Sequence, residues 1–436
     1  MYNKVLIIGE TFHKQSGGGI TLSNLFNNWP PEKLAVVTTP RSILKSDFNK
    51  CVNYYRLGKD EDDSCLFFKI IIKKSDSGRV FEQIKPPNPN ILISKSKTEI
   101  FKRSILNLFL VFIESLGLNF SCEKYKLSDK LINWIEDFNP DFIYTQLSTL
   151  QLIQLTNDLY QFKNRKVIIH IMDDWPKTIS EKCLFRKKYW DLTIENKFQK
   201  VLDISYKLLT ISEGMKEEYQ KRYGKSSDVF HNPVDVENWL RGEKSPGLIG
   251  KQAFKILYTG RIGKANSKSI FLLVQAIDIL RNQSRRNIEL YIYSTDSMRF
   301  NAKLKEFIHI KKSIPHSAMP ELLHSVDLLF LPLDFDKPSI QFAKLSMPTK
   351  ASEYMISEIP ILIFAPKETY LYQHAYENKW AQVVGEFSLK AITESIILLI
   401  DNEEIRFSFA ENAKEFALSN FDSRIVRKRF EDTFTA

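Results

Sequence analysis

Cysteine is scarce in this chain of 436 residues, and its placement excludes several classes of protein. The four cysteines, Cys51, Cys65, Cys122 and Cys183, form no CxxC pair and have no histidine at the spacing of metal ligands. This argues against a disulfide scaffold and against a zinc site built on cysteine pairs. A reducing, cytoplasmic location is the simplest expectation.

Long apolar runs are also missing. The longest hydrophobic stretch, 104–113, has only ten residues without a charge, whereas a membrane-spanning helix needs about 20. The opening MYNKVLIIGETF contains a short apolar run but no small-residue cleavage site, so it predicts a first β-strand and no signal peptide. We therefore expect a protein that does not cross a membrane by itself.

The chain is long, globular in composition and basic. Its 436 residues exceed one ordinary domain of about 100–200 residues, which suggests two or three domains. The 43% of hydrophobic and 26% of charged residues are typical of a folded protein. A formal charge of +10 favours an anionic partner, which could be nucleotide phosphates, an acidic lipid surface or nucleic acid.

Short β-branched runs alternate with helical patterns, which predicts an α/β protein built from parallel sheets. The order predicts two Rossmann-like domains, 1–232 and 233–419, joined at Asn232-Pro233-Val234-Asp235, where proline ends regular structure. A charged helix at about 420–436 could pack back on the first domain. Strands are predicted at 5–8, 35–38, 142–144, 167–172, 208–211, 256–259, 290–293, 328–332, 361–364 and 382–384.

Residues 60–126 depart from this alternation and read as an insertion in the first domain. The basic side chains of Lys95, Lys97, Lys102 and Arg103 stand beside aromatic and aliphatic ones. Residues of about 95–116 could therefore contact an anionic membrane surface. The alternative is a core helix with basic flanks.

The segment 345–364 contains the strongest local signal. A helix is expected to start near Ser346 or Met347, because serine is a good N-cap and Pro348 fits the first turn. Its free N–H groups would form an anion site near Thr349, to which Lys350 adds a charge. One turn on, Glu353 could accept hydrogen bonds from two ribose hydroxyls. The alternative is a capped surface helix.

Cations also follow the first strand of the second domain. Gly260 and Arg261 come directly after that strand, and Lys268 precedes an apolar helix. Open α/β sheets bind ligands at this edge, and two cations there could stabilise a departing nucleoside diphosphate.

The glycine run 17–19 follows the first strand of the chain. Gly18 and Gly19 let the backbone approach a phosphate or a sugar closely. The run lacks the GxGxxG spacing, which weakens the case for a dinucleotide-dependent oxidoreductase.

Polar residues lie near the end of the predicted strand 167–172 and in the turn that follows it. His170, Asp173 and Asp174 are candidates there, although a lone strand histidine is more often structural. Two adjacent carboxylates without a further ligand do not define a metal site, and we assign none.

Taken together, these motifs resemble the GT-B glycosyltransferases, specifically the large retaining family 4 that builds bacterial polysaccharides and lipid-linked glycans. The resemblance covers nearly the whole chain and implies two Rossmann-like domains that face each other across a cleft. It rests on the glycine run and on the segments HIMDDWP, LTISEGMKEEYQKRYG, FHNPVD, YTGRIG with Lys268, HSAMPELLHSVDLLFLPL and SMPTKASEYM.

The resemblance also implies roles for particular residues. The donor-binding set would be Gly18, Gly19, Gly260, Arg261, Lys268, Thr349, Lys350 and Glu353, and the catalytic candidates are Asp173 and His170. Arg261 and Lys268 would hold the diphosphate in place of a metal ion, Glu353 the ribose, and no cofactor is needed. Two positions depart from the pattern: Leu345 stands where the family has a glutamate, and Met172 where it has a histidine.

The implied activity is transfer of a sugar from a UDP- or GDP-sugar to a hydroxyl of a glycan or lipid-linked acceptor, with retention of configuration. The resemblance implies a cytoplasmic location, with peripheral binding at the inner face of the membrane as an option, and nucleic acid ranks last as a partner. Two alternatives stay open. Leu345 and Met172 would suit a noncatalytic nucleotide-sugar scaffold, and a nucleotide-sugar epimerase would share the two-domain architecture.

Overall fold

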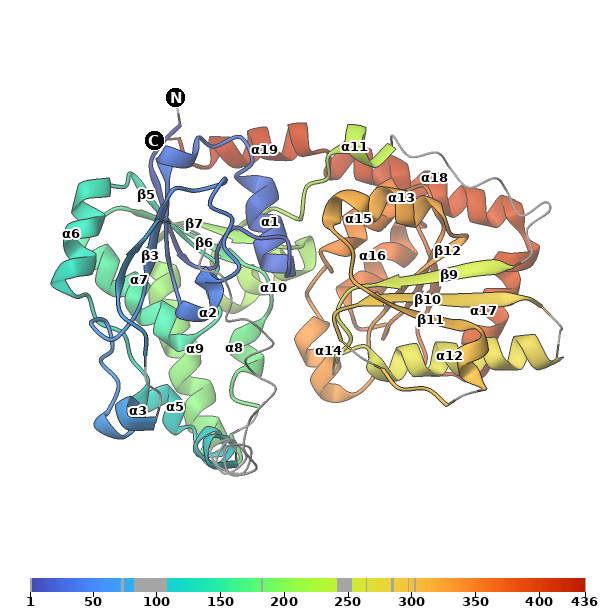
Figure 1. The fold of residues 1–436 in the computed structure, drawn as a ribbon, viewed down its shortest axis with the longest axis horizontal. Helices are drawn as coiled ribbons and strands as arrows, with labels where there is room; N and C mark the ends of the chain where they lie inside the picture. The colour runs from blue at the N-terminus through green and yellow to red at the C-terminus, as the bar shows by residue number, and fades with distance from the viewer. Residues whose placement is uncertain are drawn as a thin grey trace. The chain divides into compact units, whose positions relative to one another are not determined.

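The computed structural model describes residues 2–71, 74–81, 108–181, 183–240, 253–263, 265–283, 286–296, 298–301 and 303–435. The chain divides into two compact units (Figure 1). Unit 1 comprises Met1–Val229 with Phe430–Ala436, and unit 2 comprises Phe230–Arg429. The boundary thus lies at the start of the segment FHNPVD, close to the expected linker.

Unit 1 contains a sheet of eight strands in the order β4-β3-β2-β1-β5-β6-β7-β8. All neighbouring pairs are parallel except β3 and β4. Five strands fall where the sequence predicts them, and the short strands β3, β4 and β8 were not predicted. The strands are β1 (Val5–Gly9), β2 (Leu34–Thr38), β3 (Asn53–Arg56), β4 (Gly78–Val80), β5 (Phe142–Thr145), β6 (Lys166–Ile171), β7 (Ser205–Thr210) and β8 (Asp228–Val229).

Two of the longer helices of unit 1, α7 (Leu150–Lys163) and α10 (Glu213–Tyr223), begin and end at residues with clear capping chemistry. The hydroxyl of Thr149 accepts a hydrogen bond from a backbone N–H in the first turn of α7, and Asn164 ends that helix in the left-handed region. Ser212 and Gly224 do the same for α10. The helices are α1 (Gly17–Leu25), α2 (Pro40–Ile43), α3 (Leu66–Ile71), α5 (Leu118–Cys122), α6 (Asp129–Phe138), α7 (Leu150–Lys163), α8 (Trp175–Thr178), α9 (Lys187–Asp203) and α10 (Glu213–Tyr223), with a 3₁₀ turn at Pro31–Lys33.

The end of the chain completes the core of unit 1. Phe430 and Phe434 are buried, and they pack against Phe26 and Trp29 with ring centroids 4.9 Å (Phe26–Phe430) and 5.1 Å (Trp29–Phe434) apart. The helix α19 (Ser423–Asp432) carries them there from unit 2. Only the last residues of the expected terminal helix therefore belong to unit 1.

Unit 2 contains a six-stranded, fully parallel sheet in the order β11-β10-β9-β12-β13-β14. Its strands are β9 (Phe254–Thr259), β10 (Ile288–Ser294), β11 (Ile308–Lys312), β12 (Leu328–Pro332), β13 (Ile361–Phe364) and β14 (Gln382–Val384), of which only β11 was not predicted. Its helices are α11 (Val236–Leu240), α12 (Ser267–Gln283), α13 (Met319–His324), α14 (Lys337–Ala343), α15 (Lys350–Ile356), α16 (Tyr370–Asn378), α17 (Leu389–Asp401) and α18 (Glu403–Asn420), with 3₁₀ turns at Leu304–Glu306 and His316–Ala318.

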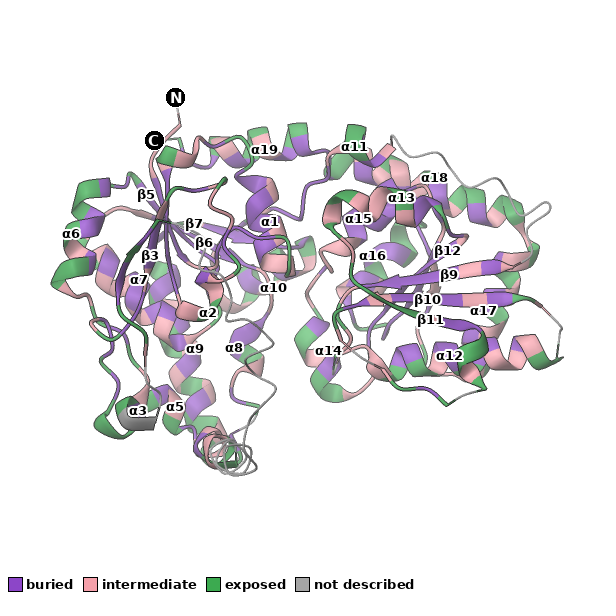
Figure 2. Cartoon of the chain, in the orientation of Figure 1, coloured by how far each residue is buried: buried purple, intermediate pink, exposed green. Residues whose placement is uncertain are grey.

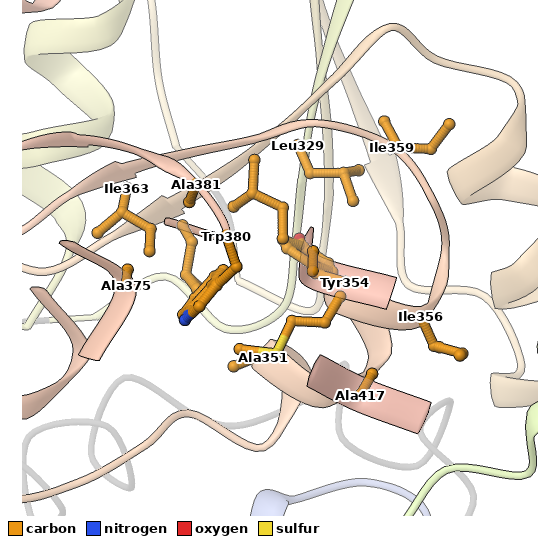
Figure 3. Packing of buried hydrophobic residues seen from close by; sticks show 14 of the residues in the cluster. Leu329, Ala351, Tyr354, Ile356, Ile359, Ile363, Ala375, Trp380, Ala381 and Ala417 are labelled. Carbon is orange, nitrogen blue, oxygen red and sulfur yellow. The ribbon is translucent and has the colours of Figure 1, made fainter. Parts of the chain in front are cut away.

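Alternate residues of the unit 2 strands feed two cores, one on each face of the sheet, because successive strand side chains point to opposite faces. Leu257 and Leu329 join the core under α15 and α16, whereas Ile256 and Leu328 join the core under α12 and α17. Figure 2 shows the buried strands and the exposed outer faces of the helices. In the first core Trp380 lies among small and aliphatic side chains (Figure 3).

The predicted insertion falls partly outside the described residues. This applies to Lys95, Lys97, Lys102, Arg103 and the rest of 82–107. Residues 108–115 are helical. Within the described ranges, no helix combines the length and apolar character that crossing a bilayer requires.

Candidate functional site

In the sheet of unit 2 the strand order reverses between β9 and β12, so that successive strands are added on opposite sides of this point. From β9 the chain proceeds outward through β10 and β11, whereas β12, β13 and β14 extend the sheet on the other side. Ligands of open α/β sheets bind beyond the carboxyl ends of the strands at such a switch point. The residues that follow β9 and β12 therefore form the candidate donor site.

An aspartate from the end of β12 caps the helix that follows β9. Both oxygens of the buried Asp334 carboxylate accept backbone N–H groups, from Lys268 at 3.1 Å and from Ser269 at 2.7 Å. The first turn of α12 is thereby satisfied and its position is fixed against the sheet. The hydrogen bond from the Lys268 N–H to Asp334 consequently fixes the backbone of Lys268 near the switch point.

The two predicted phosphate-binding cations each have an aspartate partner. Lys268 Nζ lies 2.8 Å from Asp336 Oδ2, and Arg261 Nε lies 3.7 Å from Asp296 Oδ2. The hydrogen bond that Lys268 donates to Asp336 raises the pKa of Lys268 above its usual value. Because the Lys268 and Arg261 side chains are 62% and 77% exposed, these ion pairs are weak. An anionic ligand could replace the aspartates.

Lys350 is placed differently from the prediction. Its ammonium is already engaged by protein, since Nζ donates to the Thr259 carbonyl at 2.6 Å and lies 4.3 Å from the centroid of the Tyr258 ring. Burial lowers its pKa to about 8, although the nearby Glu353 charge acts in the opposite direction. Gly260 adopts φ +118°, and a Cβ there would lie 2.8 Å from Nζ.

The expected helix start in this segment is wrong. The helix α15 begins at Lys350, so Ser346, Met347 and Pro348 lie in the preceding loop. Thr349 occupies the N-cap position but makes no side-chain capping bond. The alternative of a surface helix is also wrong, because every residue of α15 after Lys350 is buried.

Glu353 is a buried carboxylate with a fixed orientation. Its Oε1 accepts a hydrogen bond from His316 Nε2 at 2.8 Å and a longer one from Asn232 Nδ2 at 3.4 Å. Neither bond uses Oε2. Asn232 belongs to the linker segment, and its carbonyl accepts the Ser352 hydroxyl at 2.9 Å. Within the described part of the chain, the side-chain hydrogen bonds of Glu353 therefore use Oε1 alone.

Sequence reasoning missed both partners of Glu353. His316 lies in the segment HSAMP after β11, and Asn232 in the segment FHNPVD, and both segments were noted without a role. Nothing in their spacing from Glu353 reveals the contact. Leu345, where the family pattern has a glutamate, lies in the loop between α14 and α15 and supplies no carboxylate there.

In unit 1 the glycine run is the first turn of α1, and close packing explains its composition. A Cβ on Gly19 would lie 2.5 Å from the His13 ring. A Cβ on Gly18 would lie 2.9 Å from Gln146 Oε1 and 3.0 Å from Glu10 Oε2. The absence of a side chain at Gly18 and Gly19 thus leaves room for the side chains of His13, Glu10 and Gln146. None of these three residues was identified from the sequence.

The candidates around β6 differ in their surroundings. His170 is fully buried, and its Nδ1 lies 2.7 Å from the Tyr144 hydroxyl. Asp174 is buried in a two-bond ion pair with Arg222, at 2.9 and 3.0 Å, and it also accepts the Tyr219 hydroxyl. Asp173 is partly exposed. Among the residues that the structure describes, no group of three or more His, Cys, Asp or Glu could hold a metal ion.

Two units of parallel sheet and helix, with the chain end returning to the first unit, form the GT-B fold, so the expected fold is confirmed. Residues 243–416 match the family model described as glycosyl transferases group 1. This match includes Gly260, Arg261, Lys268, Thr349, Lys350 and Glu353. The comparison with curated proteins gives no match.

Solved structures of the same fold align over almost the entire chain. Sucrose-phosphate synthase from Thermosynechococcus elongatus is 11% identical over 99% of this chain and 98% of its own, with a TM-score of 0.58. HepE from Anabaena, solved in complex with UDP and glucose, is 11% identical over 99% of both chains, with a TM-score of 0.57. WaaG, a glycosyltransferase involved in lipopolysaccharide biosynthesis, is 14% identical over 99% of this chain and 100% of its own, with a TM-score of 0.58.

Proposed function

We propose that this protein transfers a sugar from a UDP- or GDP-sugar to a hydroxyl of a glycan or lipid-linked acceptor, with retention of configuration and without a metal ion. The family model and the fold support glycosyl transfer from a nucleotide sugar as the class of activity. The observation that carries the proposal is the buried Glu353 carboxylate, one of whose oxygens is not used by any described residue, on the helix that begins beside the end of β9.

In this proposal the unit 2 residues bind the donor. Glu353 accepts hydrogen bonds from the ribose hydroxyls, and Arg261 and Lys268 exchange their aspartates for the diphosphate oxygens. Gly260 and the backbone at Thr349 allow the donor to approach closely. Lys350 donates a hydrogen bond to the carbonyl of Thr259, the last residue of β9. The binding energy thus acts on the nucleotide, whose diphosphate is the leaving group.

The transfer step needs no redox partner. The acceptor oxygen forms a bond to the anomeric carbon as the bond from that carbon to the diphosphate oxygen breaks. The electron pair leaves with the nucleoside diphosphate, and the acceptor proton passes to the departing phosphate or to solvent. Arg261 and Lys268 stabilise the charge that develops on the diphosphate, which is the role of a divalent ion in other transferases.

Of the unit 1 candidates, Asp173 suits contact with a reacting sugar, because it is partly exposed beyond the end of β6. His170 suits a positioning role, because it is fully buried and its Nδ1 lies 2.7 Å from the Tyr144 hydroxyl. An Asp173→Asn variant should therefore lose more transfer activity than a His170→Asn variant of equal stability.

A donor panel tests the function. Labelled UDP- and GDP-sugars are incubated with a polyprenyl-linked acceptor, with and without EDTA, and NMR of the product gives the anomeric configuration. Transfer that resists EDTA and retains configuration is expected. Arg261→Ala and Glu353→Ala should abolish it, while Lys390→Ala, at a side chain 84% exposed on α17, should not. If the first two variants bind nucleotide as the wild type does, the proposed site is wrong.

We also propose that unit 1 contacts an anionic membrane. The helical residues 108–115 expose Leu108, Val111 and Phe112. The loop that carries the exposed Leu184 and Phe185 lies beside them, since Leu184 N donates to Ser115 O at 3.0 Å. The exposed Arg186 and Lys188 follow immediately. Apolar tips with adjacent cations suit insertion among anionic head groups.

Vesicle sedimentation tests this surface. The protein should sediment with vesicles containing phosphatidylglycerol more than with neutral vesicles, and added salt should release it. Leu184→Ser with Phe185→Ser should reduce sedimentation. Phe407→Ser, at an exposed phenylalanine of unit 2, serves as the control. Equal sedimentation of all three proteins would show that this surface does not bind the membrane.

A further inference from the structure

The strand order in the sheet of unit 1 also reverses, between β1 and β5. A set of polar residues lies at the carboxyl ends of these two strands. The strands β2 and β3 extend from one side of β1, whereas β5, β6 and β7 extend from the other. Glu10 follows β1 and Gln146 follows β5, so both lie at the carboxyl ends of adjacent strands. With His13, Gly18 and Gly19 they form what we call the glycine-turn cluster.

The side chains of Glu10 and Gln146 use only part of their hydrogen-bonding capacity within the described part of the protein. Glu10 Oε1 accepts the Thr11 N–H at 2.9 Å and lies 3.2 Å from His13 Nε2. Gln146 uses Nε2, which lies 3.4 Å from the Tyr144 hydroxyl. Glu10 Oε2 and Gln146 Oε1 take part in neither set of bonds. Both oxygens border the space above Gly18, within 3.0 Å of the place that a Cβ would occupy.

The cluster therefore offers hydrogen-bond acceptors and donors side by side. The acceptors are Glu10 Oε2 and Gln146 Oε1, and the side chain of Gln146 is nearly fully buried. The donors are the N–H groups of the first turn of α1, which have no partner within the helix. A sugar hydroxyl both donates and accepts, so it matches this arrangement.

A phosphate group matches it poorly. At neutral pH a diphosphate has no proton to donate to Glu10 Oε2 or Gln146 Oε1. Its negative charge would also stand against the Glu10 carboxylate, whose side chain is 25% exposed, and like charges at this range repel. The positive end of the α1 dipole is thus already opposed by a protein carboxylate.

We infer that the glycine-turn cluster binds a sugar hydroxyl and not the donor diphosphate, which reassigns the role that the family resemblance gives to Gly18 and Gly19. The inference rests on the proposed glycosyl transfer and adds Glu10 and Gln146 to its binding residues. The hydroxyl can come from the sugar of the donor or from the acceptor, and the two sources give different measurements.

The test compares the wild type with Glu10→Gln and Gly18→Ala. Calorimetry gives the dissociation constants of UDP, UDP-glucose, GDP and GDP-mannose, and transfer to the polyprenyl-linked acceptor is compared with hydrolysis of the same donor by water. Gly18→Ala places a methyl group between the two oxygens. Glu32→Gln removes one exposed carboxylate of unit 1 and serves as the charge-matched control. Thermal unfolding confirms that each variant is folded.

Glu10→Gln and Gly18→Ala should leave nucleoside diphosphate binding within about twofold of wild type. If the donor supplies the hydroxyl, both should weaken nucleotide-sugar binding by about tenfold or more, as expected for a lost hydrogen bond to a charged group. If the acceptor supplies it, transfer should fall by a similar factor while hydrolysis is unchanged.

Two results would overturn the inference. Glu10→Gln could tighten UDP or GDP binding by more than about fivefold, as removal of a charge that repels phosphate would do, or it could behave like Glu32→Gln in every assay. A wild-type protein that binds no nucleotide and transfers no sugar would instead refute the proposed function, and the inference with it.

Discussion

His316 Nε2 lies 2.8 Å from Glu353 Oε1, which joins the turn after β11 to the helix α15 through a single hydrogen bond. His316 also packs edge-on against Trp239, with ring centroids 5.8 Å apart. The Glu353 carboxylate therefore depends for its orientation on a residue 37 positions away in sequence. This contact leads to the first prediction.

We predict that His316 positions Glu353 for ribose recognition. The wild type should bind UDP or GDP about tenfold more tightly than the matching 2′-deoxy compound, because the deoxy ligand leaves a carboxylate oxygen without its partner. His316→Ala should reduce this ratio, and His316→Gln should restore part of it, since the amide can also donate to Oε1. Calorimetry with each ribose and deoxyribose pair gives the ratio.

His309→Ala, on the edge strand β11, is the control for this prediction. It removes a histidine of the same unit that has no contact with Glu353. If His316→Ala weakens both members of each pair equally, the histidine contributes only to the general structure of the site.

The buried ammonium of Lys350 predicts a pH dependence of stability. Its pKa is lowered to about 8 in the folded protein, from 10.5. The unfolded chain therefore binds more protons between these values, so the Lys350 contribution opposes folding below pH 8 and fades as the pH rises through the window to 10.5. Such a shift corresponds to about 3 kcal/mol.

Urea unfolding of the wild type and of Lys350→Met at a series of pH values measures this contribution. The wild type should gain stability relative to the variant between pH 8 and 10.5, and the other lysines and tyrosines cancel in the difference. A difference that is constant over this range, or that changes in the opposite direction, would show that Lys350 stays protonated in the folded protein.

Regular, buried strands were predictable because each one is a continuous apolar run that can be recognised from its own residues. The runs at β1, β6 and β12 need no knowledge of neighbours to be recognised, and all three fall where predicted. The two-residue β8 is too short to give a pattern. The hydrogen-bonded edge strand β11 carries exposed lysines, so its alternation is weak.

The site was harder to predict because its geometry depends on contacts between distant segments. Glu353 was identified from its local motif, but its partners His316 and Asn232 reach it from other elements. Lys350 was expected to face an anion because it lies at the start of a helix. Its ammonium instead donates to the Thr259 carbonyl and lies close to the Gly260 backbone. Sequence gives the residue types of such a site more readily than the directions of their side chains.

The ion pair of Arg222 with Asp174 predicts a large effect on the stability of unit 1. Its two hydrogen bonds of 2.9 and 3.0 Å join a buried aspartate to a guanidinium that is only 16% exposed. These bonds outweigh burial and raise the pKa of Arg222. Arg222→Ala would leave the carboxylate buried without its cation, which typically costs about 3–5 kcal/mol.

Chemical denaturation of Arg222→Ala and of Lys59→Ala checks this prediction. Lys59 pairs with Asp76 on the surface of the same unit, with side chains 65% and 76% exposed, so its loss should change the stability much less than the loss of Arg222. Similar losses for the two variants would mean that the Asp174 site admits water or relaxes on losing its partner.

The last prediction concerns Phe430, which belongs to unit 1 although the chain reaches it from unit 2. Its ring is fully buried, 4.9 Å from the Phe26 centroid and 6.1 Å from that of Tyr144. Phe430→Ala should destabilise unit 1 by about 3–5 kcal/mol, the usual cost of emptying a buried aromatic site. Phe407→Ala, at a ring 65% exposed in unit 2, should cost little.

Hydrogen exchange distinguishes the two units, because each amide reports the opening of its own surroundings. In Phe430→Ala the amides of β1 and α1 should exchange faster, since α1 leads directly to Phe26, while those of β12 and β13 should keep their wild-type rates. Faster exchange in unit 2 alone would show that the terminal residues stabilise the helices α18 and α19 and not the core of unit 1. Unchanged exchange in both units would mean that the core closes around the missing ring.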